Sequence, residues 1–274
     1  MPWFPRFLLA LGVAAFMGTN DVGAQTMTVT EYKAAMWEHR FANEDDRKDF
    51  RTAHISASLD TVIAASTRLI ERGTADAEAM AMARVMRAQN YLRLNLLNAA
   101  YADLAKALAL ATAGKNFVLL ALAEAEGMAT PLSRQRALEH FHEAVALNPR
   151  DPYIYYRRGL LYREARLFDL AVRDFDKVID FVPERPSAYL QRAETYRAMG
   201  DADHALRDFH AAFDRADRPF IKNTQQGLFE KKYYARAPDG IDSESFRAAV
   251  TACVRDAACK VVYAWSGDTG PDRP

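Results

Sequence analysis

Hydrophobic and small residues recur along the middle of the chain with a period of 34 positions. One set is Gly159, Tyr162, Ala171, Phe175, Val178 and Pro183. The corresponding positions one period earlier and one later hold Ala125, Met128, Ala137, Phe141, Ala144 and Pro149, then Ala193, Tyr196, Ala205, Phe209, Ala212 and Asp217. A fixed period of this length indicates a solenoid, in which each unit buries its apolar face only against its neighbours.

Each period is predicted to fold as two helices. In the best-defined unit these cover Tyr153 to Ala165 and Phe168 to Val182. Small residues at the eighth, twentieth and twenty-seventh positions let the helices approach closely, and Phe at the twenty-fourth position fills the space between them. Proline near the end stops the second helix because it cannot continue one. Four units are placed at residues 81–114, 118–151, 152–185 and 186–219.

This pattern resembles that of tetratricopeptide repeat (TPR) proteins, most closely in the last two units. The usual Trp at the fourth position is replaced by Arg84, Ala121, Tyr155 and Tyr189. The resemblance implies an all-α fold, a right-handed superhelix of helical hairpins. It further implies a concave face that is lined by the first helix of each unit and binds a protein or peptide.

The groove positions of that family can be carried over to this chain. They fall on Met82, Val85, Gln89, Leu92, Arg93, Leu119, Leu122, Glu126, Tyr153, Tyr156, Arg157, Leu160, Arg163, Leu190, Gln191, Glu194 and Arg197. Aromatic and guanidinium groups suit a peptide that carries carboxylates. The alternative, that Tyr153, Tyr156 and Leu160 pack against neighbouring units, stays open. The Lys and Asn pair that chaperone-binding members use is absent, which disfavours a chaperone C-terminus as partner.

The segments on either side of the repeats break the period. Residues 25–80 are predicted to be a helical segment, with a linker at Asn43 to Asp49 and one helix from Ala53 to Arg72. A degenerate leading repeat is the alternative interpretation of this segment. Residues 220–265 are predicted to form a C-terminal module with a turn at Asp239-Gly240 and a helix from Ser243 to Val254. Residues 266–274 are expected to be disordered.

Two interpretations of the C-terminal module are open. It is either a cap on the last repeat or a peptidoglycan-binding element, because Tyr233-Tyr234, Asp239-Gly240-Ile241 and the following helix resemble a fragment of small cell-wall domains of bacterial envelope proteins. The chain has two cysteines, Cys253 and Cys259. A close, even pair in an exported protein predicts one disulfide.

The first 24 residues are typical of a secretory signal peptide. Arg6 precedes the apolar run Phe7 to Met17, which is too short to span a bilayer, and cleavage is expected after Ala24. A retained anchor or a cytosolic start is the alternative. The mature protein is expected to be secreted or periplasmic, with membrane attachment only through an uncleaved signal segment.

The balanced net charge and the absence of catalytic sequence motifs argue against nucleic-acid binding and catalysis. The 36 basic and 36 acidic residues balance, which disfavours a nucleic-acid partner. The six histidines lack metal-ligand spacing, and no phosphate loop or nucleophile motif occurs. We therefore expect no enzyme activity, cofactor or metal. The sequence favours a protein-binding scaffold; the alternative is a peptidoglycan-associated envelope protein that recruits a cell-wall enzyme. The oligomeric state stays undetermined.

Overall fold

The structure is a computed structural model that describes residues 40–259, apart from residues 42, 57, 113 and 130–132. The predicted signal peptide, residues 25–39 and the predicted disordered tail lie outside the described residues. Export and cleavage after Ala24 therefore stay predictions. In the described part of the chain, no helix is both long enough and apolar enough to cross a bilayer.

The regular structure of the described residues is entirely helical. The helices are α2 (Glu44–Ile55), α3 (Leu59–Arg72), α4 (Ala77–Arg93), α5 (Leu97–Leu110), α6 (Lys115–Ala129), α7 (Ser133–Leu147), α8 (Pro152–Glu164), α9 (Phe168–Phe181), α10 (Pro186–Met199), α11 (Ala202–Phe213), α12 (Arg218–Glu230) and α13 (Glu244–Arg255). Consecutive helices pack as antiparallel hairpins, and the hairpins stack into the all-α solenoid that the period predicts.

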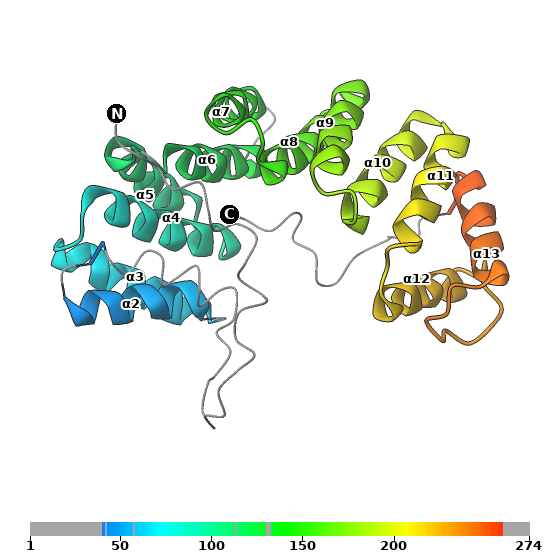
Figure 1. Cartoon of the computed structure of the whole chain (residues 1–274), viewed down its shortest axis with the longest axis horizontal. Helices are drawn as coiled ribbons and strands as arrows, with labels where there is room; N and C mark the ends of the chain where they lie inside the picture. The colour runs from blue at the N-terminus through cyan, green and yellow to red at the C-terminus, as the bar shows by residue number, and fades with distance from the viewer. Residues whose placement is uncertain (1–39, 42, 57, 113, 130–132, 260–274) are drawn as a thin grey trace, which may run out of the picture.

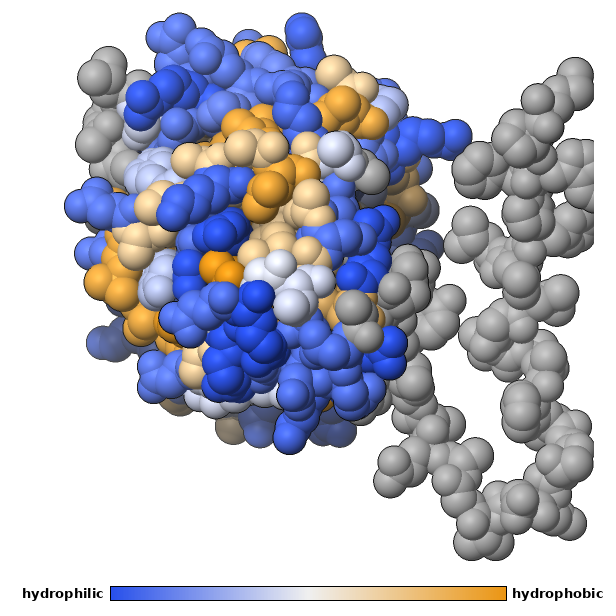
Figure 2. Space-filling view, turned by 90° about the vertical axis from the view of Figure 1, so that its left-hand side faces the viewer, coloured by the Kyte–Doolittle hydropathy of each residue, from blue (hydrophilic) through white to orange (hydrophobic). Residues whose placement is uncertain are grey.

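The hairpins form an arch with one concave side (Figure 1). Helices α4, α6, α8 and α10 line the inner side and α5, α7, α9 and α11 lie outside them (Figure 1). The inner helices also contact one another directly, α4 with α6, α6 with α8 and α8 with α10. The outer surface at the α2–α5 end is mostly hydrophilic, with small scattered apolar patches (Figure 2). The concave face is therefore built from the first helices of the units.

The predicted single helix from Ala53 to Arg72 is wrong, as is the predicted linker before it. Helix α2 ends at Ile55, and Ser58 begins α3 by accepting a hydrogen bond from the Thr61 amide. Helix α2 begins directly after Asn43, whose side chain accepts from the Asp46 amide. Acidic residues in a first helical turn complement the helix dipole, so the polar run that looked like a linker is a helix start.

The small residue at the eighth position meets the aromatic at the twenty-fourth, as the period predicts for the third unit. A Cβ atom on Gly159 would lie 2.9 Å from Cε1 of Phe175. Ala88 shares a buried cluster with Leu104, and Ala193 shares one with Phe209. These contacts set the close approach of the two helices within the first, third and fourth units.

The second unit departs from this arrangement. Ala125, its eighth residue, lies in the buried cluster of α4 and α5. Phe141, its twenty-fourth residue, lies in another cluster with Leu119, Leu120 and Ala123. Helix α6 therefore turns a different face toward its own second helix than α4, α8 and α10 do, and the in-register pairing of Ala125 with Phe141 is wrong.

The C-terminal module continues the core of the last repeat. Phe213 of α11 contacts the Phe220 and Phe246 rings at 6.0 and 4.9 Å between centroids. The predicted turn forms: Gly240 has φ +75°, and the Gln225 side chain accepts hydrogen bonds from the Asp239 and Gly240 amides. The module thus covers the end of the solenoid, and the peptidoglycan interpretation stays a prediction.

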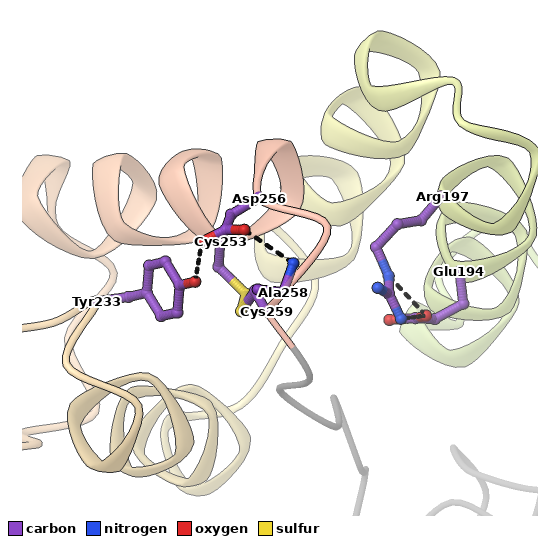
Figure 3. Close-up of a disulfide and its surroundings, with 7 residues drawn as sticks. All are labelled: Glu194, Arg197, Tyr233, Cys253, Asp256, Ala258 and Cys259. Atoms are coloured by element: carbon purple, nitrogen blue, oxygen red, sulfur yellow. Dashed lines mark hydrogen bonds and ion pairs between the residues drawn. A yellow bond between two sulfur atoms is a disulfide. The ribbon is translucent and has the colours of Figure 1, made fainter.

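Cys253 and Cys259 form a disulfide at the end of α13, with 5.2 Å between their Cα atoms. Figure 3 shows the loop that they close; Asp256 of this loop accepts a hydrogen bond from the Tyr233 hydroxyl, which comes from outside the loop. Both half-cystines are buried in the core shared with α10 and α11. The bridge therefore ties the C-terminal end of α13 to the loop that follows it.

Candidate functional site

A pocket of about 390 Å³ opens between α6 and α8. We call it the α6–α8 pocket; it is lined by Ala123, Glu124, Gly127, Phe141, Arg157, Leu160, Leu161 and Glu164. Phe141 comes from the outer helix α7, and the other lining residues come from the inner helices α6 and α8. Its size and mixture of apolar walls with a few charged groups are typical of ligand sites.

A half-buried carboxylate, that of Glu124, forms part of one wall of this pocket. Glu124 Oε1 lies 3.0 Å from Nε of Arg157 and accepts a hydrogen bond of 3.0 Å from the Tyr153 hydroxyl. Burial alone would lower the pKa of Arg157, but Glu124, Tyr153, Tyr156 and Glu164 together outweigh it and raise that pKa. Arg157 therefore stays charged at the pocket wall, held by a partner that comes from the neighbouring unit.

Glu124 can pair with Arg157 because the second unit lacks an ion pair that the other three units share. The seventh and twenty-third positions hold Arg and Asp in the other three units, and these pairs are Arg87–Asp103, Arg158–Asp174 and Arg192–Asp208. In the second unit Glu124 and His140 occupy the two positions. Glu124 was not among the predicted site residues, although the break in the repeated Arg–Asp pair is visible in the sequence.

Glu126, a predicted groove residue, does not face the concave side. Its buried carboxylate lies 3.2 Å from Nε of Arg136 and 3.5 Å from Nε2 of His140, both on α7. Burial raises the pKa of Glu126, since these cations only partly offset the loss of solvation. The rotation of α6 explains this correction: Glu126 takes the inward position toward α7 that the seventh residue takes elsewhere.

Polar side chains continue the concave face from α8 to α10. Arg163 donates through Nη1 to Oε1 of Gln191 at 2.6 Å. Arg197 donates twice to Oε2 of Glu194, at 3.0 and 2.8 Å. Burial lowers the pKa of Arg163, which has no carboxylate partner within ion-pair distance among the described residues.

Several predicted groove residues are structural. Tyr153 is buried with Leu119 and Leu120 of the second unit, in agreement with the packing alternative. Tyr156 is also buried, but its ring meets the edge of Phe175 within its own unit. Four apolar groove residues are also buried in the cores between helices: Val85, Leu119, Leu122 and Leu190. Leu160 is half-buried and lines the pocket, so its side chain can contact a bound ligand.

The predicted residues on α4 are not gathered with those on α8 and α10. Met82 is half-buried against the α2–α3 core, and Leu92 is buried within the first repeat. Gln89 has an amide nitrogen that is buried without an acceptor on the described residues. Arg93 is exposed at the end of α4. The usable face therefore runs from the α6–α8 pocket along α8 to α10.

A metal centre is not found in this part of the chain: the described residues contain no group of three or more His, Cys, Asp or Glu side chains that could hold an ion.

Comparisons with known proteins bear on the fold. No protein-family model matches the chain, and no curated protein sequence matches it. The crystal structure of MamA is similar with a TM-score of 0.50 and 23% identity over 64% of this chain and 95% of that one.

Two further solved structures are described as TPR proteins. TTC0263 from Thermus thermophilus has a TM-score of 0.45, with 23% identity over 58% of this chain and 83% of that one. YrrB, described as having an unusual peptide-binding site, has a TM-score of 0.47, with 20% identity over 67% and 91%. The helical hairpins, their repeat contacts and the MamA likeness agree: the chain has the fold of an all-α, TPR-type helical solenoid.

Proposed function

We propose that this protein is an exported, non-enzymatic scaffold that binds an extended segment of another protein along α6, α8 and α10. The observation that carries the proposal is the α6–α8 pocket on the concave face, with Leu160 on its wall and Arg157 held at its edge. A pocket that is already formed in the free protein binds a side chain with little loss of conformational entropy of the protein. This reduces the total free-energy cost of binding a flexible segment.

The chemistry of the concave face supports a peptide over a small metabolite. The pocket offers an apolar volume for one side chain, and the polar groups of Arg163, Gln191 and Arg197 extend from it along the inner helices. Protein interfaces commonly bury an apolar side chain in a central pocket and make polar contacts at the rim.

Selection from a displayed library of random peptides tests this proposal. Peptides selected on the wild-type protein should lose binding to Leu160→Asp, which places a charge on the pocket wall. Leu170→Asp is the matched control, because Leu170 is exposed on the outer helix α9. The proposal fails if no peptide is enriched, or if the selected peptides bind Leu160→Asp and the control equally well.

Export is a separate part of the proposal. We infer that the apolar run Phe7 to Met17 directs secretion and is removed with the rest of the signal peptide. Mass spectrometry of protein recovered from outside the cytoplasm should give a chain that starts at Gln25. Recovery of the intact chain from the cytoplasm alone would contradict this part and leave the binding proposal unaffected.

A further inference from the structure

Arg163 differs from the other arginines of α8 and α10 in its partners. Arg157, Arg158 and Arg192 each lie against at least one carboxylate at 3.0 Å or less. Arg163 makes one hydrogen bond, to the neutral side chain of Gln191. A guanidinium carries five N–H donors, so most of its capacity is unused by the described residues.

The nearby carboxylates do not satisfy Arg163. Glu194 pairs instead with Arg197 through one oxygen, at 2.8 Å. Glu164 is exposed on the pocket wall and forms no ion pair with Arg163. No nitrogen of Arg163 is among the buried polar atoms without a partner, so its unused donors remain open to an approaching ligand.

Arg163 lies one helical turn from the pocket. Leu160 and Glu164, which line the α6–α8 pocket, stand three residues before and one residue after it on α8. Residues three apart on a helix are neighbours on its surface. A peptide whose apolar side chain fills the pocket and whose chain continues across α8 toward α10 brings its next residues to the Arg163 guanidinium, which reaches Gln191 on α10.

We propose that the concave face recognises an acidic peptide, in which an apolar side chain enters the α6–α8 pocket and a neighbouring Asp or Glu carboxylate binds Arg163. This inference rests on the proposed function and specifies its ligand. A planar carboxylate matches the fork of a guanidinium and can accept two parallel hydrogen bonds.

The surroundings favour a singly charged carboxylate over a phosphorylated residue. Glu164 and Glu194 both lie close to Arg163 along the same face, and they repel a dianion more strongly than a monoanion. Gln191, which already accepts from Arg163, fixes the guanidinium in place and leaves its other edge free. The occupant is thus a protein segment rich in Asp or Glu rather than a phosphopeptide.

Two matched pools of short synthetic peptides test the inference. Both pools have Leu at the central position and Gly, Ser or Ala elsewhere; one adds Glu and the other Gln at each flanking position in turn. Fluorescence anisotropy with the wild-type chain should show roughly tenfold tighter binding of the Glu pool, the size expected for a hydrogen-bonded charge. A phosphoserine pool should bind more weakly than the Glu pool.

The variants locate the effect. Arg163→Gln should abolish the preference for Glu over Gln, and Arg163→Lys should keep part of it. Arg173→Gln removes the same charge from an exposed position on the outer helix α9 and should leave the preference intact. Thermal unfolding of each variant confirms that the fold is retained.

The outcomes separate this inference from the proposed function. Equal binding of the Glu and Gln pools by the wild-type chain overturns the inference, as does a preference that survives in Arg163→Gln or is reversed toward phosphoserine. In those cases peptide binding itself still stands. If neither these pools nor displayed peptides bind, both proposals are wrong.

Discussion

Arg158 on α8 and Asp174 on α9 are joined by two parallel hydrogen bonds, 2.8 Å from Nε to Oδ2 and 2.7 Å from Nη2 to Oδ1. The same fork occurs sixteen residues apart in two other units, as Arg87–Asp103 and Arg192–Asp208. Each pair ties the first helix of a unit to the second and fixes its rotation. In the second unit Glu124 and His140 replace this pair. There α6 is rotated about its axis, and the α6–α8 pocket lies beside this helix.

Breaking this fork should destabilise the fold, whereas removing Arg163 should not. Arg158→Met leaves the buried Asp174 carboxylate without its partner and should lower the free energy of unfolding by about 3–5 kcal/mol. Arg163→Met removes a half-buried guanidinium that forms no ion pair with a described carboxylate, so we expect little change or a small gain in the free energy of unfolding. Urea unfolding of both variants measures the difference. An equal loss in the two would show that the forks do not fix the helices.

Crowding at Gly159 gives a second prediction. Gly159→Ala places a methyl group 2.9 Å from Cε1 of Phe175, and this ring is fully buried. Alanine favours the helix, but the overpacking should dominate and cost about 1–3 kcal/mol. Gly127→Ala is the control, because its nearest contact would be an ordinary 3.4 Å to Leu161. Stabilisation by Gly159→Ala would contradict the close approach of α8 and α9.

The α2–α3 hairpin should be sensitive to acid through Asp49. Burial opposes the charge of this carboxylate, but hydrogen bonds from Arg68 and Arg72 outweigh burial and lower its pKa. A lowered pKa stabilises the folded state above the unfolded pKa of about 3.9, and this stability is lost as pH falls toward the folded pKa.

Thermal midpoints measured from pH 6 to pH 3 should therefore fall more steeply for the wild-type chain than for Asp49→Asn. Asp60→Asn is the control, since Asp60 is exposed on α3 and forms no ion pair with the described residues. Parallel curves for the wild-type chain and Asp49→Asn would contradict the role given to this carboxylate.

Reduction of the disulfide should weaken the C-terminal module. The bridge between Cys253 and Cys259 closes a loop of six residues' separation, and its loss should cost about 2 kcal/mol by chain entropy. Denaturant unfolding with and without reductant measures this cost, and the Cys253→Ala/Cys259→Ala variant should not respond to reductant. Peptide binding at the α6–α8 pocket should persist in the reduced protein, because the pocket is built from other helices.

Much of the fold could be predicted from the sequence because small and aromatic residues mark where helices touch. Gly159 and Phe175 meet as their period requires, and Ser243 begins the last helix by accepting a hydrogen bond from the Phe246 amide. The spacing of 34 does not determine how each helix is rotated about its axis. That rotation depends on which charged partner each helix finds, and Glu124 pairs across units with Arg157.

The candidate site was predictable only in part for the same reason. Arg157 and Leu160 line the pocket between the inner helices α6 and α8, and Arg163 reaches Gln191 on α10, so these three residues lie on or between helices that the family resemblance assigns to the groove. Glu126 was assigned to that face and instead turns toward α7, because the rotation of α6 exchanges it with Glu124. Sequence positions within a repeat thus predict the face of a regular unit but not that of the unit whose ion pair is missing.

Hydrogen exchange with and without a selected peptide tests the central claim, that the concave face at α6–α8 is the binding site, most directly. Binding should slow amide exchange in residues 123–127 and 157–164, which line the pocket, and leave the outer helix α9 unchanged. Protection confined to α9, to α12–α13 or to no described segment would contradict the account.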